Sequence, residues 1–270
     1  MSKKQTKKLK RHTPLVVGNW KMNPESIGEA KKLFLEIRKS ISRKTLQTYV
    51  AIAPPAVFLS ELERLSPSQR VKLAAQDVFH EKTGPYTGEM SLSMFKSVGV
   101  SSVIVGHSER RALGDTDEDI QKSVEAVLKA NLTAIVCVGE KIRDAQGHYF
   151  TVVETQVLSA IKGLSKSKVS QLIIAYEPIW AISKGDGKGK TATPEDAHEM
   201  KLFIQKILAD FFGRKTVDKI RILYGGSVNS QNAEELFAVG QVDGFLVGGA
   251  SLKPKEFISI INTVETYANT

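Results

Sequence analysis

The sequence predicts an α/β fold, a single (β/α)8 barrel, and three observations lead to this prediction. Eight short apolar runs alternate along the chain with segments of helical spacing. The near-continuous apolar character of each run is typical of strands that are buried on both faces of a parallel sheet. The length of 270 residues is close to the roughly 250 residues usual for such a barrel.

The expected strands are rich in valine, isoleucine, leucine and alanine, which favour buried strands. A helix between successive strands indicates parallel pairing, because a parallel connection has to cross the whole length of the sheet. The runs are residues 15–17, 49–53, 71–75, 102–105, 133–138, 172–175, 220–224 and 244–247.

Helical segments lie between these runs, with apolar residues repeated at three- and four-residue spacing. Thr116 precedes three acidic residues, and Thr193 precedes Pro194 and two acidic residues, as expected at helix N-termini. Pro254 is placed to begin the last helix. The expected buried faces are Ile27, Ala30, Phe34, Ile37 and Ile41; Ile120, Val124, Val127 and Leu128; and Phe257, Ile258, Ile261 and Val264.

Eight strand–helix units fit either a closed barrel or a doubly wound open sheet. The open dinucleotide-binding sheet needs a glycine-rich turn after its first strand. Here the first strand leads into Asn19-Trp20-Lys21-Met22-Asn23-Pro24, which contains no glycine. The barrel is therefore favoured, with residues 13–270 as one catalytic domain and residues 1–12 as a disordered basic extension.

The formal net charge of +9 comes largely from the N-terminus. Residues 1–12 hold six lysines or arginines and no acidic residue, and without them the charge is +3. Such a segment can contact nucleic acid or anionic lipid. The simpler interpretation is a solvated extension, so we expect no nucleic-acid partner beyond the tail. The tail resembles no secretory signal, and no apolar run approaches the ~20 residues of a membrane span, so we expect no membrane contact.

Cys137 is the one cysteine of the sequence, which excludes an internal disulfide and a metal site of several cysteines. It lies in the apolar run 133–138, so we expect a buried thiol in the core. A cytoplasmic location fits this cysteine usage. We expect neither a metal nor a cofactor.

Polar residues directly follow most of the expected strands. In a (β/α)8 barrel the active site lies at the C-terminal ends of the strands, so these residues are the candidates for a site. They are Asn19, Lys21, Gln76, Asp77, His107, Glu109, Glu177, Ser227, Gly248 and Gly249.

This set suits proton transfer next to the carbonyl of a phosphorylated substrate. A carboxylate can remove a proton from carbon, and an imidazole can donate to the carbonyl oxygen as charge develops there. A lysine supplies a fixed positive charge. Glycines let backbone N–H groups approach a phosphate closely, and the loops after the seventh and eighth strands often bind phosphate in this fold.

Five segments resemble the motifs of triosephosphate isomerases. They occur in the order of that family and span nearly the whole chain, leaving only residues 1–12 outside. The segments are Gly18-Asn19-Trp20-Lys21-Met22-Asn23, Gly106-His107-Ser108-Glu109-Arg110-Arg111, Ala175-Tyr176-Glu177-Pro178-Ile179-Trp180-Ala181, Tyr224-Gly225-Gly226-Ser227-Val228 and Leu246-Val247-Gly248-Gly249-Ala250-Ser251-Leu252.

The resemblance implies a TIM barrel that interconverts dihydroxyacetone phosphate and D-glyceraldehyde 3-phosphate through an enediolate, in glycolysis and gluconeogenesis. This family is itself a standard example of pKa-tuned acid–base chemistry. Glu177 would be the base, His107 the neutral electrophile, and Lys21 the cation that binds substrate and stabilises the enediolate. The remaining implied roles are orientation of substrate by Asn19, pairing of Glu109 with Lys21, and phosphate binding by Ser227, Gly248, Gly249 and Ser183.

Two departures from the family pattern have consequences. The lid segment after Ile182 is four residues longer than usual, and Ser183 stands where a glycine is expected. Asp77 follows Gln76 where asparagine is usual, in a loop the family uses for dimer contact. The segment Thr83-Gly84-Pro85-Tyr86-Thr87-Gly88-Glu89 is similar to the interdigitating loop of the family. It implies a homodimer in which Thr87 lies near the partner's Lys21.

Four other functions share single features with the chain. Another phosphate-binding barrel isomerase would share the glycines after the seventh and eighth strands, but it would not need the Asn-Trp-Lys and His-x-Glu motifs together. A P-loop would need glycine at Lys184. A zinc deaminase would need a Pro-Cys-x-x-Cys partner for His107 and Glu109. An interaction protein on an inactive barrel would not need the catalytic positions.

Overall fold

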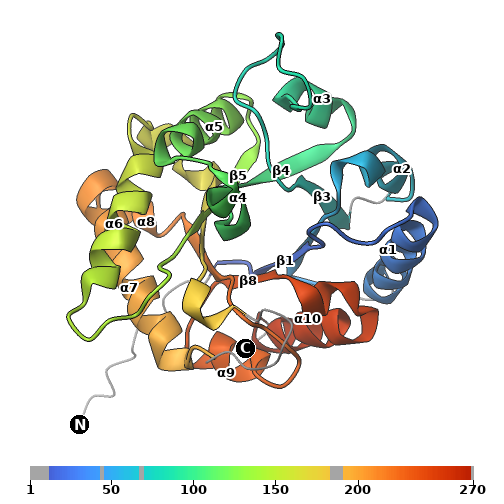
Figure 1. The fold of residues 1–270 in the computed structure, drawn as a ribbon. Helices are drawn as coiled ribbons and strands as arrows, with labels where there is room; N and C mark the ends of the chain where they lie inside the picture. Colours follow the sequence, from blue (N-terminus) through green and yellow to red (C-terminus); the bar gives the residue numbers. More distant parts are fainter. Residues whose placement is uncertain (1–11, 43–45, 67–69, 183–190, 269–270) are drawn as a thin grey trace.

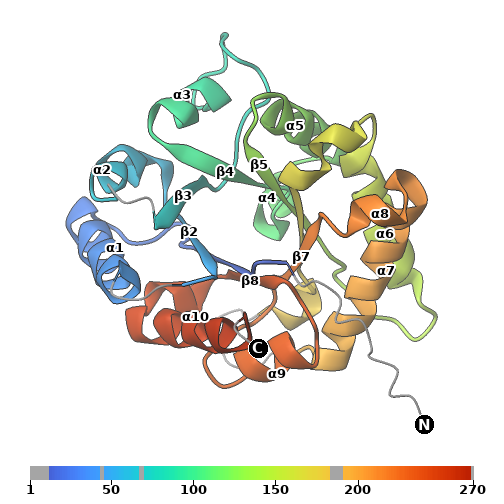
Figure 2. The same ribbon diagram turned by 180° about the vertical axis from the view of Figure 1, so that it is seen from behind.

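The computed structural model describes residues 12–42, 46–66, 70–182 and 191–268. Within these residues, eight parallel strands follow one another in sequence order and close into a barrel, which confirms the predicted fold class. Figures 1 and 2 show the strands at the centre and the larger helices in a ring around them. Pairing of the first strand with both the second and the eighth closes the ring.

The strand boundaries agree with the expected apolar runs to within two residues. The strands are β1 (Leu15–Asn19), β2 (Tyr49–Ala53), β3 (Val71–Ala75), β4 (Val100–Val105), β5 (Thr133–Val138), β6 (Leu172–Tyr176), β7 (Arg221–Tyr224) and β8 (Gly244–Val247).

Each strand is followed by one or more helices, some of them a single turn of 3-10 helix. In the described ranges, no helix is both long and apolar enough to cross a bilayer. The α-helices are α1 (Ile27–Ser42), α2 (Leu59–Arg64), α3 (Leu92–Ser97), α4 (Ser108–Leu113), α5 (Asp117–Lys129), α6 (His148–Ile161), α7 (Pro194–Phe212), α8 (Arg214–Val217), α9 (Ala233–Ala238) and α10 (Pro254–Ala268). The 3-10 helices are η1 (Ala56–Phe58), η2 (Lys166–Gln171), η3 (Ile179–Ala181) and η4 (Gly249–Leu252).

The helix start signals of the sequence act as expected. Thr116 accepts a hydrogen bond from the Asp119 backbone N–H at 3.2 Å, and the Asp119 carboxylate accepts from the Thr116 N–H at 3.1 Å. The same reciprocal pair begins α7 at Thr193. These bonds satisfy backbone donors that the first helical turn leaves without partners.

Two of the residues expected on buried helix faces are not buried. Ile27 is 38% exposed, because it is the first residue of α1 and has no preceding turn to cover it. Ile258 is only half-buried, at the edge of the apolar face of α10. The other expected members of the three faces are buried.

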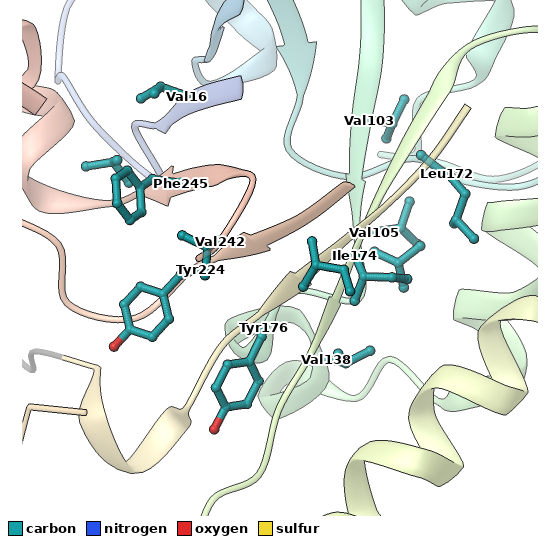
Figure 3. Packing of buried hydrophobic residues seen from close by; sticks show 14 of the residues in the cluster. Val16, Val103, Val105, Val138, Leu172, Ile174, Tyr176, Tyr224, Val242 and Phe245 are labelled. Carbon is teal, nitrogen blue, oxygen red and sulfur yellow. The ribbon is translucent and has the colours of Figure 1, made fainter. Parts of the chain in front are cut away.

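Side-chain alternation along the strands separates the apolar residues into two layers. One layer fills the barrel interior and includes Val17, Ile104 and Ala175. The other lies between the strands and the helices and includes Val16, Val105 and other residues shown in Figure 3. Consecutive residues of a strand therefore pack in different layers. A shift of one residue would exchange the two layers, so the packing fixes the register of every strand.

A buried ion pair joins α7 to the strand ends at the N-terminal side of the barrel. The ammonium of Lys201 lies 3.0 Å from Oδ1 of Asp243 and also donates to the carbonyl oxygen of Gln241. The second carboxylate oxygen of Asp243 accepts from the Ile222 N–H at 2.8 Å. The two paired side chains are only 11% and 9% exposed, so each charge depends on the other for compensation.

Replacing Lys201 by methionine should destabilise the fold by about 3 kcal/mol, because it leaves the Asp243 carboxylate buried without a cation. Urea denaturation at a fixed protein concentration measures this loss. The matched control is Lys206→Met, at an exposed position of the same helix, for which we expect a change within about 0.5 kcal/mol. If the two substitutions lower the free energy of unfolding equally, the Lys201–Asp243 ion pair does not contribute to stability beyond an exposed lysine.

Candidate active site

The alternation that fills the barrel interior continues beyond the strands and brings polar side chains into its mouth. Asn19 follows the inward-facing Val17, and Glu177 follows the inward-facing Ala175. Both polar residues are buried, at 4% and 2% exposure. They lie at the C-terminal strand ends, where barrel enzymes place their active sites.

His107 reaches the barrel mouth through a glycine turn. Gly106 has a φ of +72°, which favours glycine, and His107 then forms the N-cap of α4. Its Nδ1 accepts a hydrogen bond from the backbone N–H of Glu109 at 3.2 Å. Because Nδ1 is the acceptor, the proton of the neutral ring is assigned to Nε2.

The Glu177 carboxylate faces this histidine. Its Oε1 lies 3.2 Å from Nε2 of His107, and its Oε2 accepts from the Ser108 backbone N–H at 3.1 Å. Glycines make room for it on both sides. A Cβ atom on Gly139 would overlap the carbonyl oxygen of Glu177, and one on Gly225 would lie 2.9 Å from its Cγ.

Cys137 lies beside the same carboxylate. Burial and the neighbouring negative charge of Glu177 raise the pKa of the thiol well above its usual range. The prediction of a buried core thiol is confirmed, but the sequence analysis missed its contact with Glu177. The signal was the strand register, since Cys137 pairs with Ala175 and faces the barrel interior with it.

Lys21 has an unusual backbone that its neighbours support. Its φ of +52° is uncommon for a residue other than glycine. Its N–H donates to Oδ1 of Asn19 at 3.0 Å, and its carbonyl accepts from the Gln76 amide at 2.8 Å. The Nζ atom lies 2.6 Å from Oε1 of Glu109. Strain of this kind persists where surrounding contacts hold it, commonly at functional sites.

The loops after β7 and β8 lie at the same end of the barrel. A Cβ atom on Gly248 would lie 3.4 Å from Cε of Lys21, which places the β8 loop beside the lysine. Gly249 is exposed, with open space where a side chain would be. Ser227 follows β7, and its carbonyl oxygen accepts from the Asn232 amide at 2.9 Å. Ser183 lies outside the described residues.

The segment that follows Glu177 is anchored to the loop after β5, another feature the sequence analysis missed. Glu140 is buried and accepts hydrogen bonds from Tyr176 at 2.9 Å and from the Trp180 indole at 2.7 Å. Its carbonyl accepts from the Ile179 N–H at 3.0 Å. Burial raises the pKa of Glu140. No local pattern announces these bonds, because the partners are 36 and 40 residues apart.

A cavity of about 370 Å³ opens beside Lys21 and His107. Its wall includes Asp77, whose Oδ2 lies 2.9 Å from Nε of Arg110. Arg110 also pairs with Asp115 at 2.8 Å. Burial outweighs the attraction of the guanidinium and raises the pKa of Asp77 to about 6.

The arrangement can remove a proton from carbon and stabilise the resulting oxyanion. A carboxylate, an imidazole N–H and an ammonium group surround the barrel mouth, and the glycine pair Gly248-Gly249 follows β8. Within the described part of the chain, no three His, Cys, Asp or Glu side chains are grouped so as to hold a metal ion.

Comparisons with known proteins agree with this geometry. The model of the family described as triosephosphate isomerase matches residues 14–264. A triosephosphate isomerase of Chloroherpeton thalassium is 43% identical over 252 residues, which cover 93% of this chain and 98% of that protein. One of a Thermoanaerobacter species is 43% identical, and one of Lactiplantibacillus plantarum is 40% identical, each over at least 92% of this chain and 98% of its own length. The chain belongs to the triosephosphate isomerase family.

Proposed function

We propose that the chain interconverts dihydroxyacetone phosphate and D-glyceraldehyde 3-phosphate, with Glu177 as the base. Membership of the family supports this activity. The observation that carries the residue assignment is the 3.2 Å contact between the Glu177 carboxylate and Nε2 of His107. In this arrangement a proton acceptor, the Glu177 carboxylate, and a proton donor, the His107 imidazole, face the same small space at the barrel mouth.

Glu177 takes the proton from the carbon next to the substrate carbonyl and returns it to the neighbouring carbon. Its carboxylate is buried, yet among the described residues its Oε2 accepts a single backbone hydrogen bond, from Ser108. A substrate that enters between Glu177 and His107 can compete for this weakly held group. Transfer of this proton between the two adjacent carbons, together with transfer of the hydroxyl proton from one substrate oxygen to the other, converts the ketose into the aldose and back.

His107 and Lys21 stabilise the charge that develops on the substrate oxygens. The Nε2–H of a neutral imidazole can donate to either oxygen of the enediolate, and the N-cap position of His107 supports that tautomer. Lys21 therefore supplies the fixed cation, and Glu109 holds it until substrate binds. Asn19, which supports the backbone of Lys21, helps to orient the substrate.

The phosphate group of the substrate binds to backbone amides of Ser227, Gly248 and Gly249. The open space at Gly249 and the closeness of Gly248 to Lys21 support this placement. Phosphate there would lie near a cation and against backbone free of side chains. Ser183 remains a prediction for an additional amide from the lid.

The chain forms a homodimer through the loop of residues 83–89. This loop projects beyond the outline of the barrel between β3 and α3, and all its residues are exposed (Figure 1). Large exposed apolar side chains lie on the segments that follow β1 to β4, where a partner would cover them, and three of them, Met22, Met90 and Leu113, line the cavity. The exposed apolar side chains are Met22, Val57, Tyr86, Met90, Met94 and Leu113. The single buried thiol, Cys137, suits the reducing cytoplasm, where we place the enzyme.

Replacing Glu177 by glutamine should lower kcat at least about a thousandfold, which is about 4 kcal/mol of barrier, because the amide keeps the shape but cannot accept the proton. A coupled assay with dihydroxyacetone phosphate or glyceraldehyde 3-phosphate measures it. Glu36→Gln, at an exposed position of α1, is the matched control and should retain full activity. A loss under tenfold in folded Glu177→Gln protein would mean that another group is the base.

Replacing Thr87 by arginine should shift the chain toward monomer and reduce kcat, because the new cation would approach the partner's Lys21 in the dimer. Sedimentation velocity across a range of concentrations reports the association. Thr155→Arg adds the same charge at an exposed position of α6 and should leave a dimer. Full activity of the unmodified chain at monomer mass would contradict the proposal.

Asp77 should make the protein less stable as pH rises. Its pKa is about 6 in the fold against 3.8 for an ordinary aspartate, so folding favours the protonated form. The stabilising effect of protonation is complete below pH 4 and is lost as pH passes 6. Asp77→Asn should therefore raise stability by about 1–3 kcal/mol at pH 8 and by less at pH 5.

Thermal denaturation at the two pH values tests this expectation, with the exposed Asp210→Asn as control. If Asp77→Asn shifts Tm equally at pH 5 and pH 8, the pKa of Asp77 is not raised in the folded protein, and the expectation is wrong.

A further inference from the structure

The N-terminal end of the barrel, opposite the proposed isomerase site, has a strongly basic surface. Two chain segments that lead into adjacent strands supply it. Residues 162–171, before β6, contain no acidic residue, and residues 213–221, before and into β7, contain only Asp218. We call this surface the basic face and define it by Lys162, Lys166, Lys168, Arg214, Lys215, Lys219 and Arg221.

The fold brings the two segments together although they are about fifty residues apart. Strands β6 and β7 are neighbours, with Ile173 paired to Arg221. The 3-10 helix η2 packs against α8, and Nζ of Lys166 lies 3.9 Å from where a Cβ of Gly213 would be. Figure 2 shows α8 beside α6 and α7 at this side of the molecule.

The charges on this face lack local compensation. Lys162, Lys166, Arg214, Lys215 and Lys219 are exposed, and none of them has an ion pair with another residue of the described ranges. On the neighbouring α5 the situation is different, since both of its lysines are paired with a glutamate four residues earlier. The basic face therefore attracts a dissolved anion more strongly than an ordinary lysine-containing surface does.

The N-terminal extension joins the barrel at the same place. The Arg221 side chain donates to the carbonyl oxygen of Thr13 at 2.8 Å, so the described part of the chain starts beside the basic face. With the six cations of residues 1–12, the face and the extension carry +12 after Asp218 is subtracted, whereas the whole chain carries +9. The remainder of the sequence is thus net acidic at −3, and the excess positive charge belongs to the basic face and the extension.

The surroundings favour a nucleic acid over a lipid surface. Tyr49 is 56% exposed at the start of β2, and the Arg221 guanidinium lies 5.6 Å from its ring centre. An exposed aromatic ring beside cations suits single-stranded nucleic acid, in which bases stack and phosphates pair with lysine and arginine. Membrane insertion needs exposed apolar side chains. In the two segments, Val169, Val217 and Ile220 are buried.

We propose that the basic face binds single-stranded nucleic acid through its phosphate backbone, without dependence on base sequence. This binding is separate from the isomerase reaction and does not rest on it, because the catalytic groups lie at the opposite ends of the strands.

Fluorescence polarisation with a labelled single-stranded oligouridine RNA of about 20 nucleotides, longer than the roughly 4–16 nucleotides of a typical single-strand site, tests the proposal on the full chain. We expect Lys166→Glu/Lys215→Glu to weaken binding at least about tenfold at about 100 mM salt. The slope of log Kd against log salt concentration should fall by about 1.4, as expected for two lost phosphate contacts with a single strand. Isomerase kcat should not change, which also shows that the variant is folded.

The matched control is Lys32→Glu/Lys255→Glu, which makes the same change in net charge at exposed positions of α1 and α10. Its affinity should stay within about threefold of the unmodified chain. Equal losses in the two double variants would overturn the proposal, because net charge alone would then explain binding. Loss of all binding on deletion of residues 1–12 would place the site in the extension and overturn it too. So would tighter binding to phosphatidylserine vesicles than to the RNA.

Discussion

The closure of eight parallel strands into a barrel is the constraint on which the rest of the molecule depends. Inward-facing side chains such as Val17, Ile104 and Ala175 have to fill the interior, so polar groups reach the central axis only beyond the strand ends. Asn19 and Glu177 continue the inward alternation by one step and thereby enter the mouth. The packing rule that builds the core therefore also positions the carboxylate of Glu177 at the mouth.

Glycines that leave room for the site residues and the hydrogen bonds of Glu140 hold the site in place. Gly139 and Gly225 keep side chains away from Glu177, and the turn at Gly106 allows His107 to cap α4. Glu140 fixes the chain on both sides of Glu177 through hydrogen bonds from Tyr176 and Trp180. The site is thus a set of loops attached to a rigid frame and held by both backbone and side-chain hydrogen bonds. The two ends of the barrel differ in chemistry: the C-terminal end holds Glu177, His107 and the Lys21–Glu109 pair, and the N-terminal end holds the exposed cations of the basic face.

The strands and the helix starts could be predicted from sequence because each depends on local pattern. Apolar runs determined the strands to within two residues, and Thr116 and Thr193 cap their helices as expected. The candidate site came from polar residues at strand ends together with the family motifs. The contact of Cys137 with Glu177 and the bonds of Glu140 could not be predicted, because they join different strands and depend on register. The basic face was missed for the same reason: its two segments look like unrelated surface charge until β6 and β7 bring them together.

The central claim is that Glu177 carries a proton between two adjacent carbons of the substrate. The most direct measurement is proton NMR of glyceraldehyde 3-phosphate formed from dihydroxyacetone phosphate in D2O. A proton held on a carboxyl group exchanges with solvent, so deuterium should appear at C2 of the product, and Glu177→Gln should abolish this labelled product at the enzymatic rate. Complete transfer of the original C1 hydrogen to C2, with no deuterium from solvent, would indicate direct hydride transfer and would contradict the role given to Glu177.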